Sequence, residues 1–344
     1  METVRMSRRT TLAAAALAAS GSLIRIGATG AQDAAWPTGT LQIMAPAAPG
    51  GGWDSTAREL ARVFTEAGII AGDIEVFNVE GAGGTIGLAE LVNEHAGDEN
   101  MLMVMGLVMI GGIGLNQSPV TLEQVTPIAR LTGEFEVIVV PADSPYQTLD
   151  DLIADFTADP SSISWGGGSA GGTDHLLVAL MAQELGLDPT LVNYVPFSGG
   201  GEALASVMGG QTTAGVSGLS EWAAQIESGE LRALAISGRA GGTDGGTPAA
   251  AGSDVASSIP TLQEQGIDLE LANWRGVVSP PDLPEESVAN IVAAFDTLVA
   301  SEEWQAALAS NGWTDLYLAG AEFQAYLTEQ IATVNQTLTD LGLI

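Results

Sequence analysis

LQIMAPAAPGGGWDSTAREL, residues Leu41–Leu60, joins an apolar run, a loop with two prolines and three glycines, and an amphipathic helix. The apolar run, Leu41–Ala45, predicts a buried strand, and Asp54 or Ser55 is the expected cap of the helix. The first N–H groups of a helix have no partner within it, and glycine lets a ligand approach the backbone closely. The stretch therefore predicts an anion-binding loop at the end of a strand.

Three later segments repeat this order of strand, glycine-rich turn and helix: Gly81–Leu91, Gly166–Ala179 and Ser198–Val207. Strands that alternate with helices predict parallel pairing, and parallel sheets bind ligands beyond the carboxyl ends of their strands. All four glycine-rich loops are expected at such ends. We therefore expect them to face one another across a cleft that holds a small acid.

The pattern is less regular elsewhere in the chain. Met101–Met105 predicts a buried strand that runs into a loop, and Ile128–Val140 predicts two β segments. From Pro284 onward the sequence predicts only helices, as a tail that packs back on the first part of the chain. Together these segments predict two α/β domains.

The composition fits two globular domains and excludes several functions. The chain has 344 residues, of which 46% are hydrophobic, and a formal net charge of −32. Because so acidic a surface repels nucleic acid, we expect no nucleic-acid partner. The sequence has no cysteine and no lysine, which excludes disulfides, thiol catalysis and a phosphate-binding or Schiff-base lysine. Only two histidines are present, without metal-ligand spacing, so we expect neither a metal nor another cofactor.

Residues 1–31 have the layout of an export signal. Three arginines in the first nine residues form a basic start, an alanine-rich, weakly apolar stretch follows, and small residues precede Ala31. Ser7–Leu12, SRRTTL, resembles a twin-arginine (Tat) signal, with an ordinary Sec signal as the alternative. The weak hydrophobicity favours Tat. We expect cleavage near Ala31 and an exported mature chain.

Two motif matches suggest enzymes, and both are incomplete. Gly167–Gly171 matches G-x-S-x-G with Ser169 as the candidate nucleophile, but His175 lies only six residues later and the other histidine precedes the serine. Gly81–Gly87 is similar to a dinucleotide-binding fingerprint, except that Ile86 stands where a glycine is required. A ligand-binding loop explains the glycines in both segments, so we expect no enzyme.

Backbone N–H groups, hydroxyls and ordered water can bind a carboxylate without a cationic side chain. The hydroxyl-bearing candidates are Thr85, Ser169, Thr173, Ser198 and Ser217. Arg275 is the cation placed nearest to the expected cleft, with an ion pair between the domains as the alternative. Trp53 is a candidate wall for the ligand's carbon skeleton, with ordinary packing as the alternative. Asp54 is a candidate helix cap that orients a bridging water.

Six segments stand in an order and spacing that carry a family resemblance. They are APAAPGGGWDSTAREL, VEGAGGTIGLAEL, SWGGGSAGGTDHLL, VNYVPFSGGGEALASVMGGQ, SGELRALAIS and ANWRGVVSPPDLP. The chain resembles the extracytoplasmic solute-binding component of the tripartite tricarboxylate transporters, the TctC/Bug family, over essentially all of the mature chain. SGGGEAL and NWRGV are closer to the tricarboxylate-binding branch than to the broader Bug set.

The resemblance implies a type II periplasmic-binding-protein fold, with two α/β domains, a central ligand cleft and two crossing strands. The crossings are expected near Glu134–Val139 and Leu271–Gly276. Domain 1 would contain residues 36–136 and 276–344, and domain 2 would contain residues 137–275.

The resemblance further implies that first-domain loops bind one ligand carboxylate through backbone groups and two waters, and that the second domain closes over it. The ligand-binding residues expected here are Gly52, Trp53, Asp54, Gly83, Gly84, Thr85, Ser169, Gly172, Thr173, His175, Ser198, Gly199, Ser217 and Arg275. The implied function is periplasmic capture of a small carboxylate, such as citrate, by a monomer that delivers it to the membrane subunits of the transporter. Presentation of the ligand to a histidine kinase is the alternative role.

Overall fold

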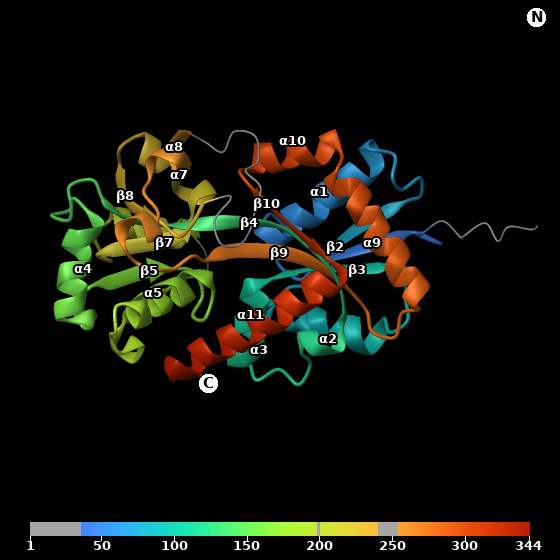
Figure 1. Ribbon diagram of the computed structural model, residues 1–344, viewed down its shortest axis with the longest axis horizontal. Coiled ribbons are helices and arrows are strands. Elements are labelled where there is room, and N and C mark those ends of the chain that lie inside the picture. Colours follow the sequence, from blue (N-terminus) through green and yellow to red (C-terminus); the bar gives the residue numbers. More distant parts are fainter. Residues whose placement is uncertain (1–35, 198–199, 240–253) are drawn as a thin grey trace, which may run out of the picture. The chain divides into compact units, whose positions relative to one another are not determined.

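The computed structural model describes residues 36–197, 200–239 and 254–344 (Figure 1). The predicted export signal therefore lies outside the described residues, and so do two candidate site residues, Ser198 and Gly199. The described residues belong to one compact unit. Its strands form two sheets that share one long strand, β4.

The first sheet begins with the predicted strand–loop–helix units. β1 pairs in parallel with β2 and β3, and β9, β4 and β10 extend this sheet by antiparallel pairing. Its strands are β2 (Ile74–Asn78), β1 (Leu41–Ala45), β3 (Met101–Gly106), β9 (Ala272–Ser279), β4 (Thr126–Pro141) and β10 (Thr314–Ala319). In the second sheet, β8 and β7 pair antiparallel with β4, and β5 pairs in parallel with β7 and β6. The further strands of this sheet are β5 (Ser164–Gly167), β6 (Asn193–Pro196), β7 (Ala214–Gly218) and β8 (Leu231–Ile236).

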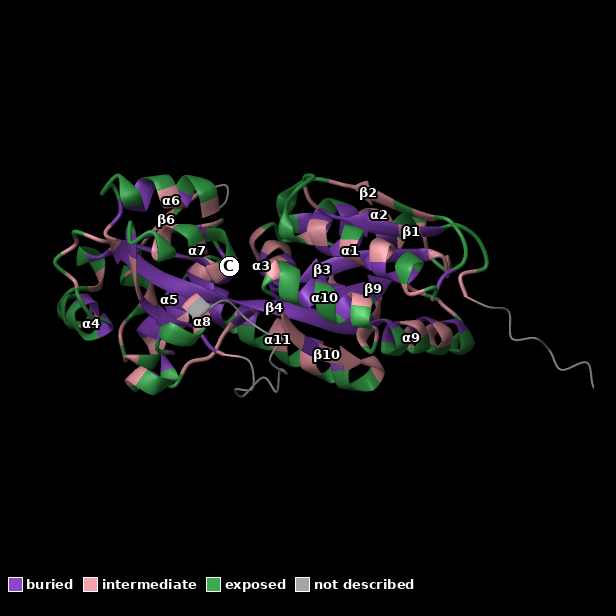
Figure 2. Cartoon of the chain, turned by 90° about the horizontal axis from the view of Figure 1, so that it is seen from above, coloured by how far each residue is buried: buried purple, intermediate pink, exposed green. Residues whose placement is uncertain are grey.

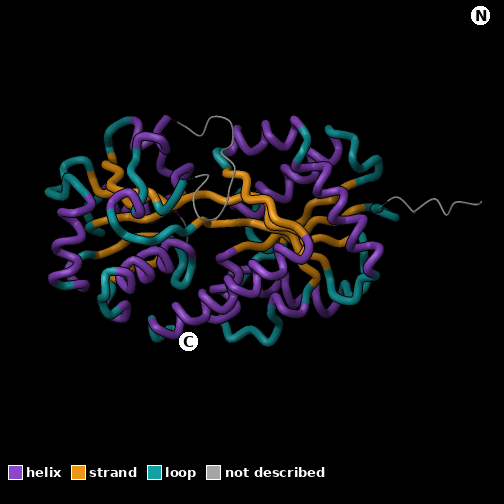
Figure 3. The backbone as a smooth tube through the Cα atoms, in the orientation of Figure 1, coloured by secondary structure: helices purple, strands orange, loops and turns teal. Residues whose placement is uncertain are grey.

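β4 passes from one sheet to the other without a break (Figures 1 and 3). Its first part, to Phe135, pairs with β9, and from Glu136 onward it pairs with β7. Figure 2 shows that the strand is buried over most of its length. The prediction of two β segments was therefore wrong. Neighbouring strands on both sides hydrogen-bond to the backbone of the polar stretch that interrupts the apolar run, so the strand continues through it. The domain boundaries expected from the sequence stay a prediction.

Eleven helices are described around these sheets. They are α1 (Gly52–Glu66), α2 (Thr85–Glu94), α3 (Leu107–Leu115), α4 (Leu149–Ala158), α5 (Thr173–Glu184), α6 (Gly200–Met208), α7 (Leu219–Glu227), α8 (Asp254–Ser258), α9 (Glu285–Val299), α10 (Glu302–Asn311) and α11 (Gly320–Asp340). Among the described residues, none of these helices combines the length and the apolar character that a membrane crossing requires.

Two further elements differ from the sequence-based expectations. The segment after β3 forms helix α3 instead of a loop, although glycine is a poor helix former. Packing explains the difference, since a Cβ added at Gly114 would lie 3.0 Å from Leu338 of α11. The all-helical tail was also wrong, because β10 lies between α10 and α11. Its alternating residues Leu316 and Leu318 carry a strand signal that the flanking helices hid.

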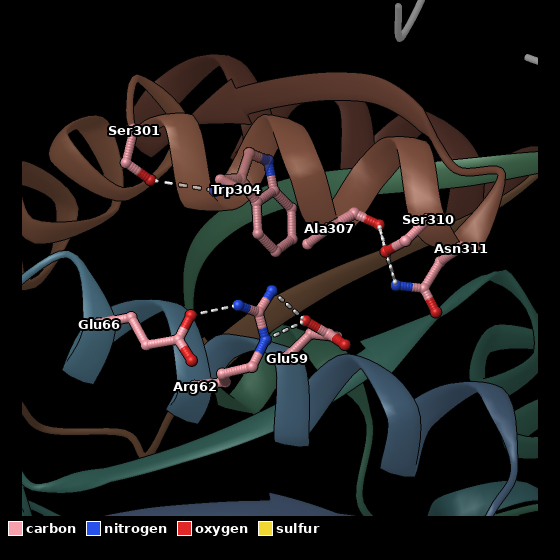
Figure 4. Close-up of polar contacts among 8 residues, drawn as sticks. All are labelled: Glu59, Arg62, Glu66, Ser301, Trp304, Ala307, Ser310 and Asn311. Atoms are coloured by element: carbon pink, nitrogen blue, oxygen red, sulfur yellow. Dashed lines mark hydrogen bonds and ion pairs between the residues drawn. The ribbon is translucent and has the colours of Figure 1, made fainter. Parts of the chain in front are cut away.

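Each sheet packs against its own aromatic core. On the first sheet, Phe64 of α1 meets Phe295 of α9 edge-to-face, with ring centroids 5.3 Å apart. Figure 4 shows the adjoining surface, where Arg62 bridges two glutamates of α1 and Trp304 of α10 points toward that helix. On the second sheet, Trp165 of β5 is fully buried among apolar side chains. These cores fix the positions of the loops that leave the sheets.

Candidate ligand site

Five helices begin directly after a glycine that supplies no side-chain cap. The glycines before α1, α2, α3, α5 and α7 are Gly51, Gly84, Gly106, Gly172 and Gly218. By contrast, Thr148 caps α4 and Ser301 caps α10 through their hydroxyls. An uncapped helix start leaves N–H donors and the positive end of the helix dipole for another acceptor. These five starts are therefore candidate anion-binding groups, because none has an acceptor side chain of its own at the cap position.

The starts of α1, α2 and α3 lie close together. A Cβ added at Gly52 would lie 2.6 Å from the Arg275 guanidinium, and one at Gly84 would lie 2.8 Å from the Trp53 ring. A Cβ at Gly106 would lie 3.3 Å from the indole nitrogen of Trp53. Trp53 is thus wedged between the starts of two helices, with part of its surface exposed. The structure brings four of the expected site residues together at this point.

Asp54 does not cap α1, contrary to the prediction, because the helix already begins at Gly52. Its buried carboxylate accepts hydrogen bonds from the Gly50 N–H at 2.8 Å, from Asn78 at 2.9 Å and from Arg58 at 2.9 Å. Hydrogen bonding by the Arg58 guanidinium is the largest cause that lowers the pKa of Asp54 to about 2. Asp54 therefore holds the glycine loop in place. Direct contact with a ligand stays a prediction.

In the second glycine-rich loop, residues 81–85, a side-chain hydrogen bond also holds the loop in place. Gly83 and Gly84 adopt positive φ angles of 64° and 87°, which glycine tolerates. The hydroxyl of Thr85 donates to the Ala82 carbonyl at 2.9 Å, so it closes the turn. A Cβ at Gly83 would lie 3.1 Å from Gly112 of α3. Small residues are therefore required where this loop and α3 meet.

The loop before α5 brings three predicted residues to the start of that helix. Ser169 is exposed, and its carbonyl accepts the Gly172 N–H at 2.9 Å. The hydroxyl of Thr173 is buried and has no hydrogen-bond partner within the described part of the chain. A Cβ added at Gly111 of α3 would overlap the Gly171 carbonyl, so this loop touches the helix that follows β3 of the first sheet.

His175, in the first turn of α5, holds the same loop in place. Its Nδ1 accepts the Gly171 N–H at 3.0 Å, and its ring stacks on Tyr194 with centroids 4.2 Å apart. Burial lowers the pKa of His175 to about 4, so the imidazole is neutral at pH 7. It therefore supplies no positive charge to a ligand, and its Nδ1 is not free to act as a base for Ser169.

The sequence reasoning missed four acids that surround this site, which we call the acidic cluster: Glu134, Glu136, Asp174 and Glu221. Arg275 pairs with Glu134 at 2.7 Å, and both side chains are about nine-tenths buried. Ser220 donates to the other Glu134 oxygen at 2.6 Å. The guanidinium that was expected near the ligand is thus already neutralised. Two glutamates at alternate positions in the β-rich run of β4 were the available sequence signal.

Glu136 and Asp174 form the buried centre of the cluster. Glu136 is fully buried, and neither of its oxygens meets a donor among the described residues. Its carboxyl faces that of Asp174, and the two can hydrogen-bond only when one of them is protonated. Accordingly, burial raises the pKa of Glu136 well above its usual range and that of Asp174 to about 6. Asp174 also accepts the Gly168 N–H at 2.5 Å.

Glu221 joins the cluster from the first turn of α7. The residue as a whole is exposed, but its carboxyl lies against Gly200, the first residue of α6, where a Cβ would overlap it. Ser217 is buried on β7 and hydrogen-bonds to Glu221. Desolvation and the neighbouring acids raise the pKa of Glu221. Across residues 36–197, 200–239 and 254–344, no three His, Cys, Asp or Glu side chains are placed to hold a metal ion.

Comparisons with known proteins agree with this arrangement. Residues 57–343 match the model of the tripartite tricarboxylate transporter family receptor, TctC. BugT of Bordetella pertussis is 26% identical over 301 residues, which cover 86% of this chain and 87% of BugT. A TctC solute-binding protein from Polaromonas, solved without ligand, is 25% identical with a TM-score of 0.72, over 89% of this chain and all of the other.

A third relative has a solved complex. MatC from Rhodopseudomonas palustris, with bound malate, is 22% identical with a TM-score of 0.66, over 88% of this chain and 100% of MatC. These likenesses confirm the predicted type II periplasmic-binding-protein fold, with two α/β domains about a ligand cleft. The family match spans most of the chain, and the uncapped helix starts suit a receptor for an anion. The protein belongs to the TctC family of tripartite tricarboxylate transporter receptors.

Proposed function

We propose that the protein is a periplasmic solute-binding protein that captures a small carboxylate and delivers it to the membrane subunits of a tripartite tricarboxylate transporter. The observation that carries this proposal is the group of uncapped helix starts at α1, α2 and α3. Their free N–H groups can donate hydrogen bonds to one carboxylate, and helix N-termini commonly bind anions in this way. A di- or tricarboxylate such as citrate is the ligand class that the family implies, and the malate bound to MatC supports it.

The proposed role needs no chemistry on this chain. Ser169 lies in a serine-hydrolase-like motif, but the adjacent imidazole of His175 holds the loop through its Nδ1. We propose that both residues shape the ligand site, that the protein acts as a monomer and that residues 1–31 direct its export. Ester hydrolysis that disappears in Ser169→Ala would contradict the non-enzymatic role. A dimer in sedimentation experiments would contradict the monomer.

A thermal-shift screen of small carboxylates tests the proposal. A ligand that binds only the folded state stabilises it by RT ln(1 + [L]/Kd), about 2.7 kcal/mol at a hundredfold excess over Kd. At a constant ionic strength, we expect at least one carboxylate to raise the melting temperature, and sugars and inorganic cations to leave it unchanged. Gly52→Ala should reduce the shift, since the added Cβ would displace the Arg275 guanidinium. A screen in which sugars raise the melting temperature and carboxylates do not would refute the proposal.

A further inference from the structure

Helix α11 packs on the first sheet but ends beside a helix of the second sheet (Figure 1). Near its start, Phe323 is buried and meets Trp274 of β9 edge-to-face, with ring centroids 6.0 Å apart. By contrast, α5 packs into the core of the second sheet, where Leu177 and Met181 join Trp165. Any movement of one sheet relative to the other therefore strains or breaks the contacts between the end of α11 and α5.

Leu338, in the last turn of α11, lies between α3 and the loop before α5. Its side chain is fully buried. A Cβ added at Gly171 of that loop would lie 3.3 Å from Leu338 and would overlap Leu115 of α3, and one at Gly114 of α3 would lie 3.0 Å from Leu338. One buried leucine thus packs at once against the helix that follows β3 and against the glycine-rich loop that follows β5.

A hydrogen bond joins α11 to α5 at the same place. Asp340 accepts the side-chain amide of Gln183 on α5 at 2.8 Å through one oxygen. Through its other oxygen it accepts the amide of Gln336, one turn earlier in α11, also at 2.8 Å. The bond from Gln183 therefore runs between the two sheets, whereas the bond from Gln336 stays within one helix.

We propose that Leu338 and Asp340 form a latch that holds the α5 loop against α3 and so stabilises the arrangement in which the two sheets enclose a ligand. Contacts present in one arrangement alone raise its population, and the apparent affinity rises with the population of the arrangement that binds. The inference rests on the proposed function and adds two positioning residues to it. Both act through the loop that carries Ser169 and Thr173, and neither belongs to the predicted ligand-binding set.

Distances between two spin labels test the latch directly. The chain has no cysteine, so introduced cysteines can be labelled cleanly. Ala154→Cys on α4 and Ala306→Cys on α10 place labels at exposed positions on either side. In this background and without ligand, Leu338→Ala and Gln183→Glu should shift population from the wild-type distance to a second one in double electron–electron resonance. The first variant removes a buried contact, and the second sets two carboxylates against each other.

Two matched controls separate the latch from a general loss of stability. Leu327→Ala makes the same truncation at another fully buried position of α11, about 16 Å before Leu338 along the helix axis. Gln336→Glu also sets a carboxylate against Asp340, but within α11. Both controls should keep the wild-type distances, and circular dichroism should show all four variants folded. Distances that Leu338→Ala and Leu327→Ala change alike, or that neither changes, would overturn the inference.

Isothermal titration calorimetry and stopped-flow kinetics with malate, succinate and citrate test the effect on binding. For the probe that binds most tightly, Leu338→Ala should weaken affinity by about tenfold and Gln183→Glu by about two- to fivefold, chiefly through faster dissociation. Leu327→Ala and Gln336→Glu should stay within about twofold of the wild type. Unchanged affinity in Leu338→Ala would overturn the inference while the proposed function stands. If the wild type binds none of the three probes, that counts against the proposed function, whereas the label distances still decide the inference.

Discussion

Replacing Asp54 by asparagine tests how the glycine loop is held. In the folded chain the pKa of Asp54 lies at about 2, against 3.8 for an unperturbed aspartate, chiefly because Arg58 hydrogen-bonds to the ionised form. Each pKa unit corresponds to ~1.4 kcal/mol, so ionised Asp54 contributes about 2.5 kcal/mol to the free energy of unfolding at neutral pH. The Asp54 carboxylate is buried, but the Arg58 side chain is 55% exposed, so solvent screening makes this figure an upper bound.

The sign of the pH dependence follows from the lowered pKa. The stabilisation is complete above the unfolded-state pKa of 3.8 and is lost as the pH falls through 3.8 toward 2. Urea denaturation at pH 7 should therefore show Asp54→Asn less stable than the wild type by up to about 2.5 kcal/mol, and this difference in stability should narrow steadily between pH 4.5 and pH 3.

Asp73→Asn is the control for Asp54→Asn. Asp73 is exposed and directly precedes β2, so its substitution should alter the free energy of unfolding by less than about 0.5 kcal/mol. Since Asp54 also fixes the Gly50 N–H, Asp54→Asn should weaken carboxylate binding as well. A difference between Asp54→Asn and the wild type that stays constant from pH 7 to pH 3 would refute the reasoning.

Three further changes test other parts of the structure. In urea denaturation, Glu136→Gln should stabilise the protein more at pH 7.5 than at pH 4.5. The pKa values of Glu136 and Asp174 are raised in the folded chain, so the wild type loses stability as the pH rises from about 4 through 6. An equal effect of the substitution at both pH values would contradict this prediction. Gly111→Ala should lower both melting temperature and ligand affinity, because its Cβ overlaps the Gly171 carbonyl, whereas Gly201→Ala, with open space at its Cβ, should lower neither. Raising NaCl from 0.1 M to 2 M should raise the melting temperature, since salt screens the repulsion of a chain with net charge −32; a fall would contradict the prediction.

Local pattern was enough to place most elements. The sequence predicted β1 with its observed bounds, and the strand predicted at Met101–Met105 is one residue shorter than β3. These elements have strong apolar periodicity and are bounded by glycine, proline or polar residues, so the signal lies within each segment. Where a segment was almost wholly apolar, as in α3, pattern alone could not separate helix from loop, and packing against α11 decided the outcome.

The glycine-rich loops, and their place after strands, follow from the sequence, because a glycine at a helix start acts through its own backbone. The partners of the charged side chains were decided by the tertiary structure. Glu134 meets Arg275, which lies far along the chain, and Glu136 meets Asp174 only because β4 crosses between the two sheets. Contacts between distant segments leave no local pattern. The sequence therefore determined where the proposed anion site lies, and the fold determined that the opposite side of this site is acidic.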